Sequence, residues 1–467
     1  MAKHARNSPK GRDVFKTPDH SASEHDAMAF RSPSEKNLRQ LEAAHTWHPF
    51  AQMREFLSYP PLFIERAKGL HVYDTHGRRY LDANSSLWTN VHGHNDNALN
   101  AALIRQLKKA AHTTWLGLSH PPASELAAAL IKEAPKKLAR VFFSDNGAGA
   151  IEIAIKQSWQ YWMQTGFSQK QEIIGLTHGY HGDTLLCMAA GDSGDFHGKF
   201  KKFFPPAWHC PRPENASAAQ TRKSLGALER HLKAHAKKTA CLVMEPLLQG
   251  SAGMYFHSPA FVRGVARLCR QYRVHLILDE VFTAFGRMGQ VCVCKQLGVT
   301  PDFLCLAKGL GGGYLPIAAT LTSEDIYEAF LGRLEDGNAF IHGHTFTANP
   351  LACAVALESL KKLKKLIAHG TLKARIKSFH KHFKAAFKNH PHVAAMRYGG
   401  LAAAVDLVPD AKRPHKKYPL GARAGLQVCL EARKRGLILR PLGDTLLFVP
   451  SPAMKPAQHA QLFKKTL

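Results

Sequence analysis

Short apolar runs alternate with longer amphipathic stretches through the middle of the chain. Residues 241–244 and 276–278 are apolar at every position and too short for a helix, whereas residues 124–131 repeat their apolar positions with helical spacing. Strands that are apolar on both faces and separated by helices are typical of a parallel sheet covered by helices. The pattern therefore predicts an α/β fold with a mainly parallel sheet.

Both ends of the chain differ from this middle part. Residues 1–42 are rich in Ser, Lys, His and Asp and hold few apolar side chains, which predicts a disordered basic extension. The remaining length exceeds the roughly 250 to 300 residues that one core usually serves. We expect a large domain over residues 101–348 and a small α+β domain built from residues 43–100 and 349–467.

The formal net charge is +28, and lysines are densest over residues 361–388. Leucines recur there at helical spacing with lysines between them, which predicts an amphipathic helix with a basic face in solvent. The alternative is a surface for nucleic acid or another polyanion, which a basic patch alone does not specify. We favour the solvated helix face and expect no nucleic-acid partner.

The nine cysteines suggest neither disulfides nor a metal site. Their number is odd, and the one close pair, Cys292 and Cys294, has the spacing of neither a zinc knuckle nor a redox CxxC motif. Residues 16–25 offer no apolar core for a signal peptide, and no apolar run approaches the ~20 residues of a membrane span. The sequence therefore predicts free thiols in a reducing cytoplasm, with no metal and no membrane partner.

Two apolar runs end in residues suited to chemistry. Residues 274–278 end at Asp279, and residues 303–307 end at Lys308, which a glycine-rich turn without the GK[ST] sequence of a P-loop follows. In α/β sheets, ligands bind at the carboxyl ends of the strands. A desolvated lysine can form a Schiff base with an aldehyde, and a carboxylate can keep a pyridine nitrogen protonated. The pair therefore predicts pyridoxal 5′-phosphate (PLP) as the cofactor.

Two further loops fit such a site. Gly147 and Ala148 follow the apolar run 141–143 and open a helical pattern, so their N–H groups can approach a phosphate. Tyr180 follows the run 172–176 and can lie against a flat ring.

The motifs together resemble those of the class III PLP-dependent aminotransferases, from about residue 47 to residue 454. They are Trp-His-Pro-Phe at 47–50, Asn-Val-His-Gly-His at 90–94, Tyr-His-Gly-Asp-Thr at 180–184, Glu-Pro at 245–246, Leu-Ala-Lys-Gly at 306–309, His-Gly-His-Thr-Phe at 342–346 and Arg-Pro-Leu-Gly-Asp at 440–444. The resemblance implies the fold type I architecture of PLP enzymes and a homodimer with shared active sites. Within the class it is closest to members of biotin synthesis, which convert 8-amino-7-oxononanoate to 7,8-diaminononanoate.

The resemblance also implies roles for the matching residues. Lys308 would hold the cofactor as a Schiff base and shuttle a proton, and Asp279 would pair with the pyridine nitrogen. Tyr180 would cover the ring face and border the substrate. The N–H groups of Gly147 and Ala148 would bind the phosphate.

Other matching residues would complete the substrate site. Gly343, His344 and Thr345 would reach the phosphate or the substrate of the neighbouring subunit. Arg440 would bind the substrate carboxylate with its planar guanidinium.

The amino donor stays open between S-adenosylmethionine and lysine. Phe50 and Trp88 would line the substrate pocket, but Phe50 stands where the form that uses S-adenosylmethionine has a tyrosine. Leu87, His344 and Leu447 also replace a tryptophan, a proline and a tyrosine of that form. The motifs at residues 47–50, 90–94, 342–344 and 440–444 look more like the branch that uses lysine.

Two other functions are compatible with parts of the sequence. A class III transaminase for an ω-amino acid or a diamine would carry the same motifs. A basic protein on an old enzyme fold would bind nucleic acid without PLP. Because Asp279 and Lys308 are both present, we favour a ping-pong transamination in which pyridoxamine phosphate carries the amino group between the two half-reactions.

Overall fold

The computed structural model describes residues 34–59 and 61–467. The chain divides into two compact units, Met1–Phe63 and Ile64–Leu467. Residues 1–33 of the predicted disordered extension lie outside the described residues. Helix α1 (Glu35–His45) begins after Ser34, whose Oγ accepts a hydrogen bond from the N–H of Asn37 at 3.3 Å. The helical chain therefore starts before residue 43, earlier than the sequence predicts; α2 (Met53–Phe56) follows in the same unit.

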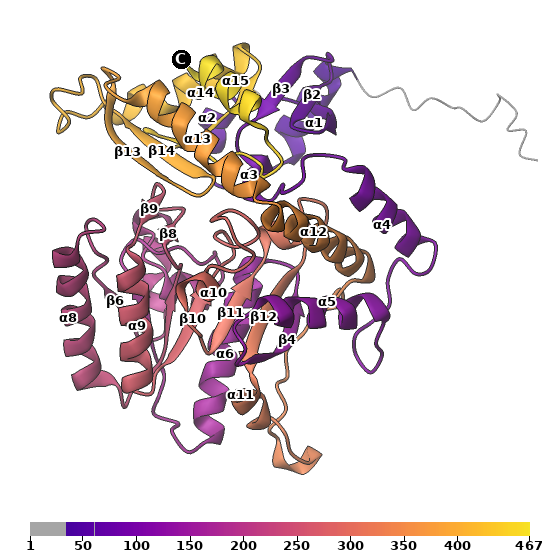
Figure 1. The fold of residues 1–467 in the computed structure, drawn as a ribbon, viewed down its shortest axis with the longest axis vertical. Helices are drawn as coiled ribbons and strands as arrows, with labels where there is room; N and C mark the ends of the chain where they lie inside the picture. The colour runs from indigo at the N-terminus through magenta and orange to yellow at the C-terminus, as the bar shows by residue number, and fades with distance from the viewer. Residues whose placement is uncertain (1–33, 60) are drawn as a thin grey trace, which may run out of the picture. The chain divides into compact units, whose positions relative to one another are not determined.

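The second unit is built around a seven-stranded sheet with the strand order β4-β12-β11-β10-β7-β5-β6 (Figure 1). Strand β12 runs antiparallel to both of its neighbours, and the pairs from β11 to β6 are parallel. The strands are β4 (Leu138–Ser144), β5 (Glu172–Leu176), β6 (Ala207–Cys210), β7 (Thr239–Met244), β10 (His275–Asp279), β11 (Phe303–Leu306) and β12 (Ala318–Ser323).

Alternate side chains of these strands join different helices, because successive residues of a strand point to opposite faces. Ile277 of β10 packs in one core cluster with residues of α6 (Gly147–Gln164) and α7 (Leu185–Ala190). Leu276 and Leu278 pack in another with α5 (Pro121–Glu133), α8 (Ala218–His235) and α9 (Pro259–Gln271). Both faces are therefore covered, as the continuous apolar runs predict.

Of two smaller sheets, the first combines the beginning and the end of this unit, and the second is built from its end alone. In the first, β3 pairs in parallel with β15, and in the second the order is β13-β14-β17-β16. Their strands are β1 (Ile64–Lys68), β2 (His71–Asp74), β3 (Arg79–Asp82), β15 (Leu437–Ile438), β13 (Val393–Gly399), β14 (Ala402–Leu407), β16 (Arg440–Leu442) and β17 (Thr445–Phe448). The remaining longer helices are α4 (Asn97–Leu107), α12 (Pro350–Ala368), α13 (Thr371–Phe387), α14 (Ala424–Lys434) and α15 (Pro456–Thr466).

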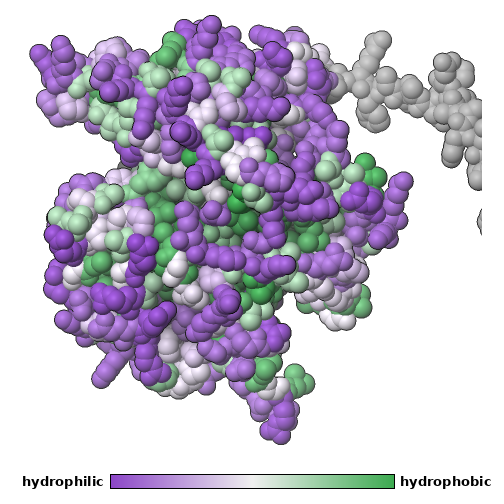
Figure 2. Space-filling view, in the orientation of Figure 1, coloured by the Kyte–Doolittle hydropathy of each residue, from purple (hydrophilic) through white to green (hydrophobic). Residues whose placement is uncertain are grey.

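The sequence predicted a single helix over the basic segment 361–388, and this is wrong: the segment forms parts of two helices, α12 and α13. Gly370 stands between them with a φ of 67°, in the left-handed region that favours glycine and ends helices. Several of its lysines have acidic partners: Lys362 Nζ lies 2.6 Å from Asp96 Oδ2. Hydrophilic residues cover most of the molecular face in Figure 2. No helix among the described residues is long and apolar enough to cross a membrane.

Candidate active site

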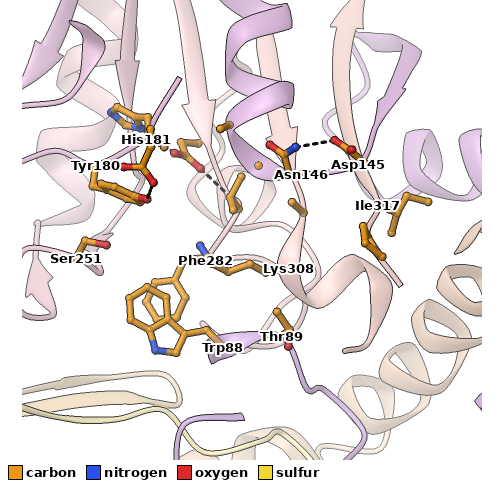
Figure 3. Close-up of a pocket in the computed structure, with 18 of the residues that line it drawn as sticks. Trp88, Thr89, Asp145, Asn146, Tyr180, His181, Ser251, Phe282, Lys308 and Ile317 are labelled. Atoms are coloured by element: carbon orange, nitrogen blue, oxygen red, sulfur yellow. Dashed lines mark hydrogen bonds and ion pairs between the residues drawn. The ribbon is translucent and has the colours of Figure 1, made fainter. Parts of the chain in front are cut away.

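A cavity of about 660 Å³ lies at the carboxyl ends of the large sheet's strands, within the second unit. Its volume is in the range of about 300 to 1,000 Å³ that small-molecule sites occupy. Asp279 ends β10, Lys308 follows β11, and Glu245 follows β7. Because parallel strands present their carboxyl ends at one edge, residues far apart in the sequence converge here (Figure 3).

Lys308 points into this cavity with a strained backbone. Its φ is 42°, in a region that residues with a side chain rarely adopt and that often marks functional sites. Protein atoms crowd around the amine, and this desolvation lowers the pKa of Lys308 even though the charges of Asp279 and Glu245 oppose the shift. Nζ lies 5.3 Å from the ring centroid of Trp88 and 5.9 Å from that of Phe282. The neutral amine, which is the nucleophilic form, is therefore more populated than it is for a lysine in water.

Asp279 is held by two hydrogen bonds. His181 Nδ1 lies 2.7 Å from Asp279 Oδ2, and the N–H of Val281 donates to Oδ1 at 3.0 Å. The side chains of His181 and Asp279 are only 1% and 5% exposed, so water does not compete for this contact. His181 Nε2 is buried without a partner among the described residues. The carboxylate is thus fixed at the cavity wall with a buried imidazole behind it.

Glu245 adds a second buried carboxyl group. Its Oε1 accepts a hydrogen bond from the N–H of Gly250 at 3.0 Å, and Oε2 has no partner within the described part of the chain. Burial, followed by the negative charge of Asp279, raises the pKa of Glu245. Glu245 therefore takes up a proton more readily than an exposed glutamate does, which reduces the negative charge around Lys308.

The N-terminus of α6 forms another wall. Asn146 caps it by accepting a hydrogen bond from the N–H of Gly149 at 2.8 Å, and both Gly147 and Ala148 line the cavity. The first N–H groups of a helix have no acceptor within it and attract anions. A Cβ at Gly147 would come within 2.7 Å of Val281 Cγ1, so only glycine fits there. This wall suits a phosphate group.

Tyr180 lines the cavity with an anchored ring. Its hydroxyl donates to Asp183 Oδ2 at 2.9 Å, and the ring centroid lies 6.0 Å from that of His197 in a stacked arrangement. Burial and the bond to Asp183 raise the pKa of Tyr180, and the charge of Arg440 partly opposes this shift. Tyr180 is therefore a neutral flat surface at the edge of the cavity.

Several predicted site residues do not line this cavity. Gly343, His344 and Thr345 lie in a loop beside α6, where His342 Nδ1 is 3.0 Å from Lys156 Nζ. Exposed Arg440 begins β16 and interacts with Tyr180 only through its charge. Phe50 belongs to the first unit, where its side chain is 62% exposed.

The cavity residues absent from the predicted site include His181, Glu245 and Phe282. His181 lies inside the motif at residues 180–184, of which only Tyr180 was predicted to belong to the site. Glu245 follows a buried strand as Asp279 does, so its position was a usable signal. Phe282 carries no signal of its own, because its contact with Trp88, at 4.3 Å between centroids, is made only in the fold.

One group of side chains in the described chain has the composition of a metal site: Glu172, His231 and His235. His231 Nε2 lies 2.7 Å from Glu172 Oε1. The two imidazole rings are stacked 4.4 Å apart and are parallel within 5°. Imidazole binds metals in its ring plane, so one ion cannot be bound by both rings as they stand. The contact between His231 and Glu172 is therefore an ordinary histidine–carboxylate pair and does not indicate a metal site.

Comparison with known proteins gives the same assignment as the geometry. The family model for "Aminotransferase class-III" matches residues 54–466. The chain belongs to this family. As a class-III aminotransferase it is a PLP-dependent transferase of amino groups, which confirms the family, the cofactor and the α/β fold with a mainly parallel sheet that the sequence predicts.

Relatives of this class-III aminotransferase share most of its length. It is 42% identical over 426 residues to the adenosylmethionine-8-amino-7-oxononanoate aminotransferase of Nitratidesulfovibrio vulgaris, covering 88% of this chain and 78% of the relative. The enzyme of the same name from Geobacter sulfurreducens is 40% identical over 427 residues, covering 90% of this chain and 94% of the relative.

Two crystal structures resemble its fold. The adenosylmethionine-8-amino-7-oxononanoate aminotransferase of Methanocaldococcus jannaschii superposes with a TM-score of 0.88 at 36% identity, covering 92% of this chain and 98% of the other. A PLP-bound amine transaminase from an uncultivated Pseudomonas species gives 0.84 at 28% identity, covering 90% and 97%.

Proposed function

We propose that this class-III aminotransferase converts 8-amino-7-oxononanoate to 7,8-diaminononanoate in biotin synthesis. The observation that carries the chemistry is the convergence of Lys308 and Asp279, from neighbouring strands, on one cavity. The names and coverage of the relatives support the substrate.

The residues of the cavity suit the aldehyde, the pyridine nitrogen and the phosphate of PLP. Lys308 would bind the aldehyde through Nζ, and Asp279 would pair with the pyridine nitrogen through a carboxylate that His181 orients. The N–H groups of Gly147 and Ala148 would bind the phosphate at the positive end of α6. Tyr180 would cover the cofactor ring. When bound, the cofactor supplies an electron-withdrawing ring that acidifies the C–H bond beside the amino group.

Lys308 also moves the proton. With the cofactor bound, Nζ of Lys308 would be the group that takes up the proton from the substrate carbon and delivers it again within the cavity. Its lowered pKa serves this step, because general bases work best near the operating pH. Trp88 and Phe282 border Nζ and exclude water from the transfer. We assign the substrate's carboxylate to Arg440 and its aliphatic chain to Trp88.

The enzyme would act as a homodimer in which Gly343, His344 and Thr345 serve the partner's cavity. Apolar side chains next to their loop support this: Leu116 is 75% exposed and Ile341 is 85% exposed. The loops that carry them are adjacent, since His112 and Phe346 lie 4.7 Å apart between ring centroids. Such a patch in a soluble chain is typical of an interface. The nine buried free thiols support the proposed cytoplasmic location.

Mixing two inactive variants tests the shared site. Lys308→Ala lacks the reacting amine, and Thr345→Asp places a negative charge where a phosphate would bind. If the loop serves the partner's cavity, each mixed dimer contains one intact site, and random mixing restores about a quarter of the wild-type activity. If the loop serves its own cavity, no mixed dimer is active.

The substrate is tested with purified protein and mass spectrometry of the products. We expect 7,8-diaminononanoate from 8-amino-7-oxononanoate with either S-adenosylmethionine or lysine as the donor, and Lys308→Ala is the inactive control. The relatives' names favour S-adenosylmethionine, whereas the motifs around residues 47–50 and 342–344 favour lysine, and the two donors are compared separately. Turnover of ω-amino acids or diamines without any diaminononanoate would overturn the proposal.

A further inference from the structure

The turn that carries Trp88 has a backbone unusual for its residues. Ser85, Ser86, Leu87 and Trp88 have φ angles of 49°, 45°, 63° and 74°, and none of them is glycine. The left-handed region is unfavourable for residues with a Cβ, which approaches the following carbonyl oxygen. Strain of this kind persists only where surrounding contacts enforce it.

The carboxylate of Asp82, the last residue of β3, provides those contacts. Oδ1 accepts the N–H of Asn84 at 3.0 Å, and Oδ2 accepts the N–H of Ser86 at 2.8 Å and its hydroxyl at 3.0 Å. His94 Nε2 lies 3.0 Å from the same Oδ2. The side chain of Asp82 is 6% exposed, so these bonds are not exchanged for water.

His94 is itself fixed, so it holds Asp82 from behind. The Asn90 side-chain Nδ2 lies 2.9 Å from His94 Nδ1, and an amide nitrogen can only donate. His94 Nδ1 therefore accepts, and in the neutral ring Nε2 carries the proton that it donates to Asp82. The backbone of His94 is paired with that of Gly69 through two hydrogen bonds of 2.6 and 2.9 Å.

Trp88, at the end of the turn, has no polar anchor of its own. Its Nε1 is buried without a partner among the residues described. The ring packs 4.3 Å from that of Phe282 and borders Lys308 (Figure 3). A Cβ at Gly250 would lie 3.4 Å from Trp88 Cζ3, so the ring also sits close to a glycine backbone. The orientation of Trp88 therefore depends on packing and on the backbone of the turn.

We propose that Asp82 is the positioning residue of the substrate pocket. By holding residues 85–88 in the left-handed turn, its carboxylate fixes Trp88 as an apolar wall beside Lys308, and so sets the fit of the substrate's aliphatic part. This rests on the proposed function in one respect: the side of Lys308 that Trp88 borders is taken as the substrate side.

Asp82→Asn tests the proposal, with Asp74→Asn as a matched control. Asp74 ends β2 of the same sheet and also holds a turn, accepting the N–H of Arg78 at 2.8 Å and the hydroxyl of Tyr80 at 2.8 Å, but neither bond reaches residues 85–88. In protein labelled with 5-fluorotryptophan, Trp88→Phe assigns the Trp88 signal. We expect Asp82→Asn to shift or broaden that signal. KM for the amino acceptor should rise by about tenfold, because the substitution removes one hydrogen bond to a charged group. The change in kcat should be smaller. Asp74→Asn leaves the signal and KM unchanged.

A rescue variant separates the turn from general stability. Glycine adopts the φ of Leu87 without strain, and the Leu87 side chain is 45% exposed and outside the cavity lining. Asp82→Asn combined with Leu87→Gly should therefore recover part of the Trp88 signal and of KM. If Asp82→Asn does not fold, Ser86→Ala, which removes only the hydroxyl bond to Asp82, should give a smaller shift of the same kind.

An unchanged Trp88 signal and KM in Asp82→Asn, or in Ser86→Ala if the former is unfolded, would overturn the inference. The fluorine signal needs no substrate. A shifted signal in a protein that does not convert 8-amino-7-oxononanoate would therefore refute the proposed function and leave the role of Asp82 intact.

Discussion

Replacing His181 with alanine tests how the cavity holds Asp279. The 2.7 Å contact between His181 Nδ1 and Asp279 Oδ2 is almost fully buried, so its loss leaves a carboxylate oxygen without a partner and without water. A hydrogen bond to a charged group contributes about 1.5 to 3 kcal/mol. If Asp279 binds the pyridine nitrogen, the dissociation constant of PLP should rise by roughly ten- to a hundredfold.

The assay is a titration of cofactor-free protein with PLP, followed by the absorbance of the bound cofactor, with circular dichroism as a check of folding. His231→Ala is the matched control, because His231 Nε2 lies 2.7 Å from Glu172 Oε1, a contact of the same length and type, and neither residue lines the cavity. The affinity of His231→Ala for PLP should therefore stay at the wild-type value. Equal effects of the two variants, or unchanged PLP affinity of His181→Ala, would refute the reasoning.

Two further outcomes follow from close packing and from burial. Gly147→Ala should weaken PLP binding by about tenfold, because the new Cβ would overlap with Val281, and Gly147→Ala with Val281→Ala should recover most of it; equal affinities of the single and double variants would contradict this. Burial lowers the pKa of His257 from 6.5 to about 3, so the unfolded chain takes up the proton first and stability is lost as the pH falls below 6.5. Between pH 6.5 and 5 the free energy of unfolding of the wild type should fall by about 2 kcal/mol for this reason, whereas His257→Phe should not show this part of the fall. Denaturant unfolding at several pH values measures both, and parallel pH profiles of the two proteins would exclude a contribution of His257.

The central pair of the site could be predicted because it depends on sheet geometry alone. Asp279 and Lys308 each end an apolar run, and the carboxyl ends of parallel strands meet at one edge whatever the details of the loops. Gly147 and Tyr180 follow strands in the same way. These residues needed only the order of strands and helices, which hydrophobic patterning supplies.

The supports of the site could not be predicted, because they depend on contacts between distant segments. His181 contacts Asp279 although the two residues are 98 positions apart in the sequence. The left-handed turn at residues 85–88 opposes the preference of every residue in it, and its contacts with Asp82 and with Val449 come from other parts of the fold. The break at Gly370 was visible in the sequence, but the apolar spacing on either side of it favoured one continuous helix.

Lys308 is the residue on which the proposed chemistry depends most, because it would bind PLP. Reduction of the PLP-loaded protein with borohydride makes the bond between lysine and cofactor permanent, and peptide mapping by mass spectrometry locates it. We expect the added mass on Lys308 alone, and no specific adduct in Lys308→Ala treated in parallel. A wild-type adduct on another lysine, with Lys308 unmodified, would contradict the account.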